Sequence, residues 1–273
     1  MIAQRKTFRK PGTTMKQIAL IAVFAMTAVA SFAVPGRITK TGDNGKQIVG
    51  DIIWKQVAKK YVITQKGGLE VEVAFDEVAK VETQRPKELE GAVNAVKSGK
   101  AAAAIPVLEK IVKDYAMLQW DEPAARFLAE AYVAVDRPAD AVKTCESIIA
   151  LRPEAAYMGE MAMSYWTALL KTGKTAKLQD LVEKAARSGE RVAAARALVM
   201  RGDMLAAQKQ YKEALEDGYL RVVVLYKNIK EVQPEAIYKA MQAFEAIQQV
   251  PYAERMRSLL RSDYPSSDYA KKL

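Results

Sequence analysis

Hydrophobic and polar positions follow two different periods along this chain. Between residues 36 and 83, apolar and polar residues alternate in short β-rich runs, which the turns Gly42–Gly45 and Lys66–Gly68 separate. After Arg85 and Pro86 the apolar positions recur with a helical period as far as the last residues. Proline suits the first turn of a helix and favours an extended residue before it. The pattern therefore predicts strands first and helices afterwards, with a boundary near residue 84.

The strand region, residues 34–84, is predicted to form a small β module. Its runs are too few for a β-sandwich and fit a four- or five-stranded curled sheet or an SH3-like barrel. One face of the sheet is expected to carry Leu69, Val71, Val73 and Phe75, which are every second residue of one run. Two aromatic residues, Trp54 and Tyr61, are candidates either for a ligand-binding patch or for packing in the core and against the helices.

The helical region, residues 85–273, shows a regular spacing of small residues. Ala129 and Ala141 stand twelve residues apart, and Gly202 and Ala214 repeat this spacing further along the chain. A small residue at each position lets two helix backbones approach closely, where a bulky side chain would force them apart. We expect roughly ten helices in this region, arranged as about five antiparallel pairs.

This spacing resembles the thirty-four-residue helix-turn-helix unit of the tetratricopeptide repeat (TPR) superfamily. The positions that fit the repeat in order are Leu128, Ala129, Tyr132, Ala141, Cys145, Ile148 and Pro153. The later stretch Tyr264-Pro265-Ser266 is similar to repeat endings of bacterial envelope proteins of the outer-membrane assembly and Tol-Pal coordinator type. The resemblance implies a mainly α fold, a TPR-like solenoid of helical pairs behind the SH3-like module, which binds other proteins and has no enzymatic activity.

The same resemblance implies a concave face lined by the first helix of each pair, which is the usual binding surface of such solenoids. We expect Trp166, as a half-exposed tryptophan, to be the main anchor for a partner. The candidate partner-binding residues on this register are Arg126, Glu130, Val133, Met163, Trp166, Arg196, Val199 and Asp203.

The first 33 residues have the order of a secretory signal peptide, with basic residues, then an apolar run from Ile18, then small residues. Cleavage after Ala30 or after Ala33 is plausible, and the second is favoured; translation from Met1 or from Met15 remains open. An uncleaved anchor is the alternative, although the apolar run is short for the ~20 residues that span a bilayer. We therefore expect an exported protein of the periplasm or cell envelope, associated with membrane at most peripherally or through an uncleaved signal.

Composition excludes several classes of function. The chain of 273 residues has a formal net charge of +10, but five basic and no acidic residues lie in the first 33, which leaves an excess of only five. A nucleic-acid partner is therefore not expected. There is no histidine and one cysteine, Cys145, which is expected to be a buried small residue. Histidine-based triads and histidine or cysteine metal sites are excluded, and we expect no catalytic residue, cofactor, metal or small-molecule substrate.

The sequence thus predicts an exported, non-enzymatic adaptor that binds other envelope proteins or peptides. One alternative is a polyanion- or cell-wall-binding protein, because lysines and arginines surround Tyr211, Tyr219 and Tyr226. Another is a hydrolase with paired carboxylates, for which Asp121-Glu122 and Glu216-Asp217 are the candidates, although both pairs resemble helix starts and solvated faces.

Overall fold

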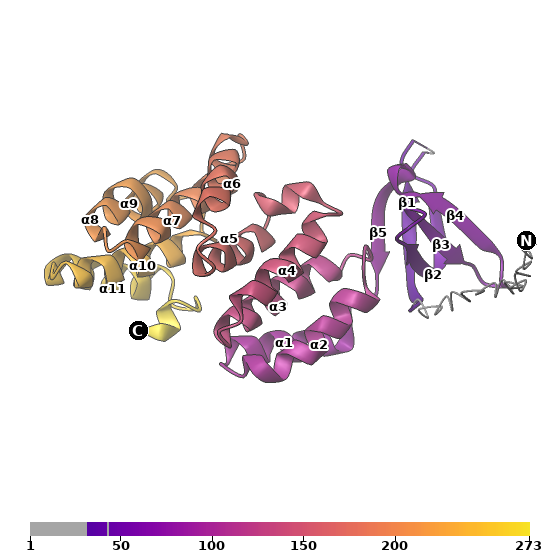
Figure 1. The fold of residues 1–273 in the computed structure, drawn as a ribbon, viewed down its shortest axis with the longest axis horizontal. Helices are drawn as coiled ribbons and strands as arrows, with labels where there is room; N and C mark the ends of the chain where they lie inside the picture. The colour runs from indigo at the N-terminus through magenta and orange to yellow at the C-terminus, as the bar shows by residue number, and fades with distance from the viewer. Residues whose placement is uncertain (1–31, 43) are drawn as a thin grey trace, which may run out of the picture. The chain divides into compact units, whose positions relative to one another are not determined.

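A computed structural model describes residues 32–42 and 44–273, which fold as one unit with strands first and helices afterwards (Figure 1). The predicted signal peptide falls almost entirely outside the described residues, and its cleavage stays a prediction. The first strand begins at Val34, the residue that would follow a cut after Ala33. Within the described ranges, no helix is both long and apolar enough to cross a membrane.

Five strands form one antiparallel sheet in the order β4-β3-β2-β1-β5. Sequence neighbours pair from β1 to β4, and β5 returns after a short 3-10 turn to pair with the other side of β1. The sheet is therefore a small meander with β2 at its centre, with β1 between β2 and β5, and with β4 and β5 at its edges. The strands are β1 (Val34–Lys40), β2 (Gln47–Lys55), β3 (Lys60–Thr64), β4 (Glu70–Ala74) and β5 (Val78–Thr83).

One face of the sheet is apolar because alternate residues point to it, and Val73 follows this rule with 1% exposure. The prediction that all four residues of the β4 run share this apolar face was wrong for the first and the last of them. Leu69 and Phe75 lie just outside the strand and are exposed, since the alternation holds only where the chain is extended and paired. The SH3-like assignment of this sheet stays a prediction.

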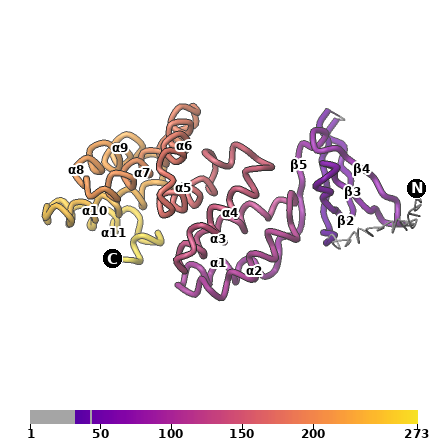
Figure 2. The backbone as a smooth tube through the Cα atoms, in the orientation of Figure 1, coloured from indigo at the N-terminus to yellow at the C-terminus, as the bar shows by residue number. Residues whose placement is uncertain are grey.

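The helical region is built of antiparallel pairs that follow one another in chain order (Figure 2). The strands end at Thr83 and the first helix begins at Lys87, on either side of Arg85 and Pro86. The first three pairs are α1 (Lys87–Lys97) with α2 (Ala101–Asp114), α3 (Asp121–Ala134) with α4 (Pro138–Ile149), and α5 (Met161–Lys171) with α6 (Thr175–Arg187). The fourth is α7 (Arg191–Ala207) with a continuous helix made of α8 (Tyr211–Ala214), a π-turn (Leu215–Tyr219) and α9 (Leu220–Leu225), and the fifth is α10 (Gln233–Ala246) with α11 (Val250–Asp263).

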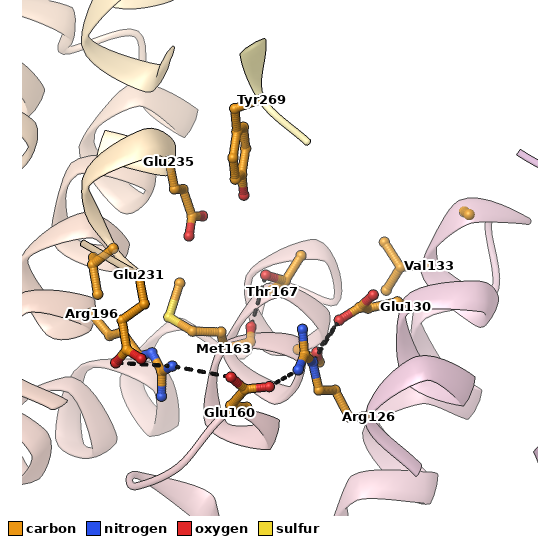
Figure 3. A pocket seen from close by; sticks show the side chains of 13 residues that line it. Arg126, Glu130, Val133, Glu160, Met163, Thr167, Arg196, Glu231, Glu235 and Tyr269 are labelled. Carbon is orange, nitrogen blue, oxygen red and sulfur yellow. Dashed lines mark hydrogen bonds and ion pairs between the residues drawn. The ribbon is translucent and has the colours of Figure 1, made fainter. Parts of the chain in front are cut away.

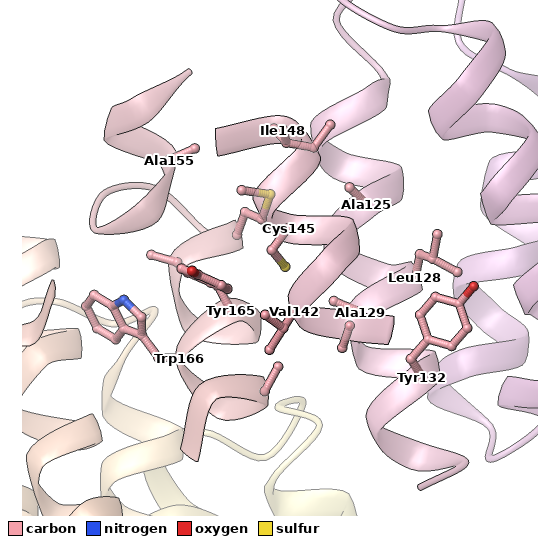
Figure 4. Packing of buried hydrophobic residues seen from close by; sticks show 14 of the residues in the cluster. Ala125, Leu128, Ala129, Tyr132, Val142, Cys145, Ile148, Ala155, Tyr165 and Trp166 are labelled. Carbon is pink, nitrogen blue, oxygen red and sulfur yellow. The ribbon is translucent and has the colours of Figure 1, made fainter. Parts of the chain in front are cut away.

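Small residues lie where the helices of a pair touch, as their spacing predicts. Ala129 and Ala141 are completely buried between α3 and α4, and Cys145 lies beside them with no exposed surface (Figure 4). In the fourth pair Gly202 faces the π-turn so closely that a Cβ atom on Gly218 would lie 2.6 Å from the Cα atom of Gly202. Side chains larger than these cannot enter without moving a helix.

The sheet and the helices share part of their core. Met117 and Leu118, in the loop between α2 and α3, pack into the apolar face of the sheet. Tyr61 is buried there and donates a hydrogen bond of 3.1 Å to the carbonyl oxygen of Met117. Of the two roles considered for Tyr61, core and helix packing is the one it has. Trp54 contacts it at 4.7 Å between ring centroids and stays half-buried.

Candidate protein-binding groove

The first helices of successive pairs line a groove of about 430 Å³ (Figure 3). Helix α3 contributes Arg126, Glu130 and Val133, which lie at i, i+4 and i+7 and so share one face. Helix α5 adds Met163, and α7 adds Arg196. Five of the eight predicted partner-binding residues therefore line one hollow; whether a partner touches them stays a prediction.

Other groove residues have no counterpart among the predicted ones. Glu160 precedes α5, Glu231 and Glu235 flank the start of α10, and Tyr269 comes from the segment after α11. The predicted set stopped at the fourth pair and at regular helix positions, so residues in turns and in the last pair were missed. The glutamates could have been found by extending the repeat register to the turns before Met161 and Gln233 and to the first turn of α10.

Ion pairs cross the floor of the groove. The Glu160 carboxylate contacts the guanidinium of Arg126 and lies 3.8 Å from that of Arg196 (Figure 3). Arg196 also lies 3.7 Å from Glu231, and Arg126 lies 3.1 Å from Glu130. Pairs of this kind near solvent contribute only about 0–1 kcal/mol each to stability. They are weak enough to exchange with the charges of a ligand.

The groove is acidic in balance. Its lining carries four carboxylates, on Glu130, Glu160, Glu231 and Glu235, against the two guanidinium groups already named. An adjoining hollow of about 540 Å³ shares Arg126 and Glu160 and adds Glu122 and Arg152, so its own charges balance; burial is the main cause of the raised pKa of Glu122. Apolar surface from Val133, Met163 and Val232 lies between the charges. Such a lining suits a segment with positive charges and apolar side chains.

Three predicted site residues lie elsewhere. The expectation that Trp166 is half-exposed was wrong: it is completely buried, and its indole Nε1 donates a hydrogen bond of 2.8 Å to the carbonyl oxygen of Ala156 (Figure 4). Val199 is also completely buried, in the apolar core of the last two pairs. Each follows a groove residue by three positions, which is about 60° short of a full helical turn, and this offset takes its side chain past the edge of the groove into the core.

Asp203 is the third, and it takes part in a mostly buried polar cluster. Its carboxylate accepts a hydrogen bond from the Tyr219 hydroxyl at 2.8 Å and from Lys239 Nζ at 2.6 Å. Burial lowers the pKa of Lys239, but the carboxylates of Glu235 and Asp203 outweigh it, and the pKa lies above its usual value. The cluster ties α7 to α10, so Asp203 joins neighbouring pairs and does not line the groove.

One residue of each candidate carboxylate pair and one of the three tyrosines are engaged in structural contacts. Asp121 is completely buried and accepts two hydrogen bonds of 3.0 Å from the guanidinium of Arg152, and Asp217 pairs with Arg221 at 2.9 Å. Tyr219 is buried against Gly202, which removes it from any surface on which a polymer could stack. In the described part of the chain, no three histidine, cysteine, aspartate or glutamate side chains are grouped so as to hold a metal ion.

Comparison with known proteins adds little to this geometry. No protein-family model matches the chain, and no curated protein matches it. Two crystal structures of the nearly identical TPR-like repeats of a "putative kinesin light chain" from Podosopora anserina, one carrying Q17M, are similar at 19% identity. They cover 66% and 68% of this chain and 95% and 94% of their own chains, with TM-scores of 0.44 and 0.42. Likeness at this level carries no argument, and the fold rests on the helix pairs themselves.

Proposed function

We propose that this chain is an exported, non-enzymatic TPR-type adaptor of the bacterial cell envelope, which holds an extended, positively charged segment of a partner protein in its groove. The observation that carries the proposal is the acidic, partly apolar groove to which four successive helix pairs contribute. A linear segment can meet residues of α3, α5 and α10 in turn, as stacked helical pairs allow.

The charge of the groove favours a protein segment over an anionic polymer. A polyanion would meet four carboxylates at the lining, whereas lysine or arginine side chains would find partners in Glu160 and Glu231. The existing ion pairs with Arg126 and Arg196 keep these carboxylates in place before a ligand arrives. Binding of this kind is expected to weaken with added salt, because charges near solvent are screened.

A photo-crosslinking residue placed at Val133, in the groove, tests the proposal in the native cell. It should capture a specific partner protein, and the same residue placed at Lys143, on the exposed side of α4, should not. Charge reversal by Glu160→Lys or Glu231→Lys should reduce capture, whereas Glu213→Lys, at an exposed glutamate outside the groove, should leave it unchanged. Equal capture from both positions, or equal loss from all three reversals, contradicts the proposal.

Export is tested separately by the mass of the native protein. Cleavage of the signal gives a mature chain that begins at Val34, or at Ser31 for the other cut. Both cuts leave the whole of β1, which starts at Val34, in the mature protein, so the mass decides between them. An intact leader on a protein that fractionates with cytosol would exclude the envelope.

A further inference from the structure

The segment that follows α11, residues 264–273, returns to the groove; we call it the strap. Tyr269 of the strap lines the groove (Figure 3). Its ring lies 5.6 Å from that of Tyr238 on α10, and Lys272 Nζ lies 4.6 Å from the Tyr269 ring centroid. Aromatic pairs and cations over aromatic faces at such distances attract one another. The strap is therefore packed on the last helix pair with one side chain in the groove.

The strap also reaches the first helix pair. Asp268 Oδ2 lies 3.0 Å from Nζ of Lys97, in the last turn of α1, although 171 residues separate the two. Both side chains are about half exposed, at 55% and 51%. An ion pair so open to solvent is weak and screened by salt. The strap is thus fixed to the first pair by a weak contact, while Tyr269 and Leu273 pack against the apolar core of the last two pairs.

The chemistry of the strap matches the groove. Tyr269 approaches Glu235, and its pKa is raised by burial and then by the negative charge of that carboxylate, so the hydroxyl keeps its proton as a donor. Lys271 and Lys272 follow within three residues; Lys272 Nζ lies over the ring of Tyr269, and Lys271 Nζ pairs with Asp268 at 3.2 Å. An aromatic donor with positive charge beside it suits a lining in which carboxylates predominate.

We propose that the strap is an internal ligand of the groove, and that the partner segment which displaces it has the same chemistry, a tyrosine followed closely by basic residues. This inference rests on the proposed function and specifies its partner. A tethered ligand acts at a high effective concentration, of millimolar order for a short flexible link. The apparent affinity for a partner is therefore the intrinsic affinity multiplied by the fraction of molecules in which the groove is free of the strap.

The probe for this proposal is a fluorescein-labelled synthetic peptide with the sequence of Ser266–Leu273. It is titrated into the full chain and into a chain truncated after Pro265. We expect saturable binding to the truncated chain and at least about tenfold weaker binding to the full chain, because the tethered strap competes. A peptide with alanine in place of the tyrosine is the matched control and should bind poorly. No saturable binding to a truncated chain that keeps its helical circular dichroism overturns the proposal.

Charge exchange in the full chain gives a second test that does not need the truncation to fold. Asp268→Lys places like charges at the strap contact but leaves Lys97 free for the aspartate of the peptide, and it should increase peptide binding several-fold. The double variant with Lys97→Asp restores opposite charges at the strap contact and should return binding to the wild-type value or below it. Equal binding by all three proteins means that the strap does not guard the groove.

These results are separable from a failure of the proposed function. If the peptide binds the truncated chain but Glu160→Lys does not affect capture in the cell, the groove prefers its own strap and the adaptor role is wrong. If capture depends on Glu160 while the truncated chain ignores the peptide, the adaptor role stands and the strap proposal is wrong.

Discussion

The indole Nε1 of Trp166 donates a hydrogen bond of 2.8 Å to the main-chain oxygen of Ala156, inside the core between the second and third pairs. Replacement of Trp166 by alanine leaves a cavity and removes this bond, and we expect a loss of about 3–5 kcal/mol in the free energy of unfolding. Partner affinity per folded molecule should not change, because the side chain does not reach the groove. Denaturant unfolding and a binding assay at matched folded concentration measure the two effects; unchanged stability with weaker binding would contradict the burial.

Gly202 and Gly91 form a matched pair of helix glycines. A Cβ atom at Gly202 would collide with the ring of Tyr219, whereas one at Gly91 would meet nothing within 4 Å. Gly202→Ala should therefore lower the unfolding free energy by about 1–3 kcal/mol through overpacking. Gly91→Ala should raise it by about 0.5–1 kcal/mol, because alanine loses less backbone entropy in a helix. Thermal unfolding compares the variants, and equal shifts at both positions would mean that the fourth pair is packed more loosely.

The pair of Arg152 with Asp121 joins the end of α4 to the start of α3. Arg152→Met leaves the buried Asp121 carboxylate without its charged partner, and we expect a loss of about 3–5 kcal/mol. The double variant Asp121→Asn with Arg152→Met removes the charge as well and should lose less than the sum of the single changes. A double-mutant cycle by denaturant unfolding measures the coupling, and additive losses would show that the two side chains act independently.

Because Tyr61 is buried, the stability of the sheet is expected to fall at alkaline pH. Burial raises the pKa of Tyr61 to about 12, from an ordinary value of 10.0. The folded state therefore keeps the phenol protonated where the unfolded chain ionises, so this contribution is complete below about pH 10 and is lost as the pH rises to about 12. Urea unfolding of the wild type and of Tyr61→Phe across this range should give curves that converge with rising pH. A constant difference between them would contradict the burial of the hydroxyl.

The sequence predicts those parts of the fold that depend on residues close together along the chain. The change of period at Arg85-Pro86 and the spacing of Ala129 from Ala141 depend on neighbours within one pair, and the helix pairs appear as expected. Arg126 and Arg196 are likewise on first helices and reach one carboxylate, that of Glu160.

The sequence does not predict contacts between segments that are far apart along the chain. Tyr269 and Glu130 line one groove although 139 positions separate them, and no period in the sequence relates such residues. Trp166 was misplaced for a finer reason. A difference of about 60° around one helix separates the groove from the core. The carbonyl oxygen that binds the indole belongs to a short 3-10 turn at Pro153–Ala156.

The position of β1 between β2 and β5 has a consequence for cleavage of the predicted signal peptide. Val34 pairs with Ile52 on β2, and two residues later Gly36 pairs with Thr83 on β5, so the sheet is complete only after residue 83 has arrived. From then on β1 is held on both sides from Gly36 onward, whereas Phe32 and Ala33 stay exposed beside the complete sheet. A cut after Ala33 would therefore remove none of the strand pairings, and the sheet would be the same before and after maturation.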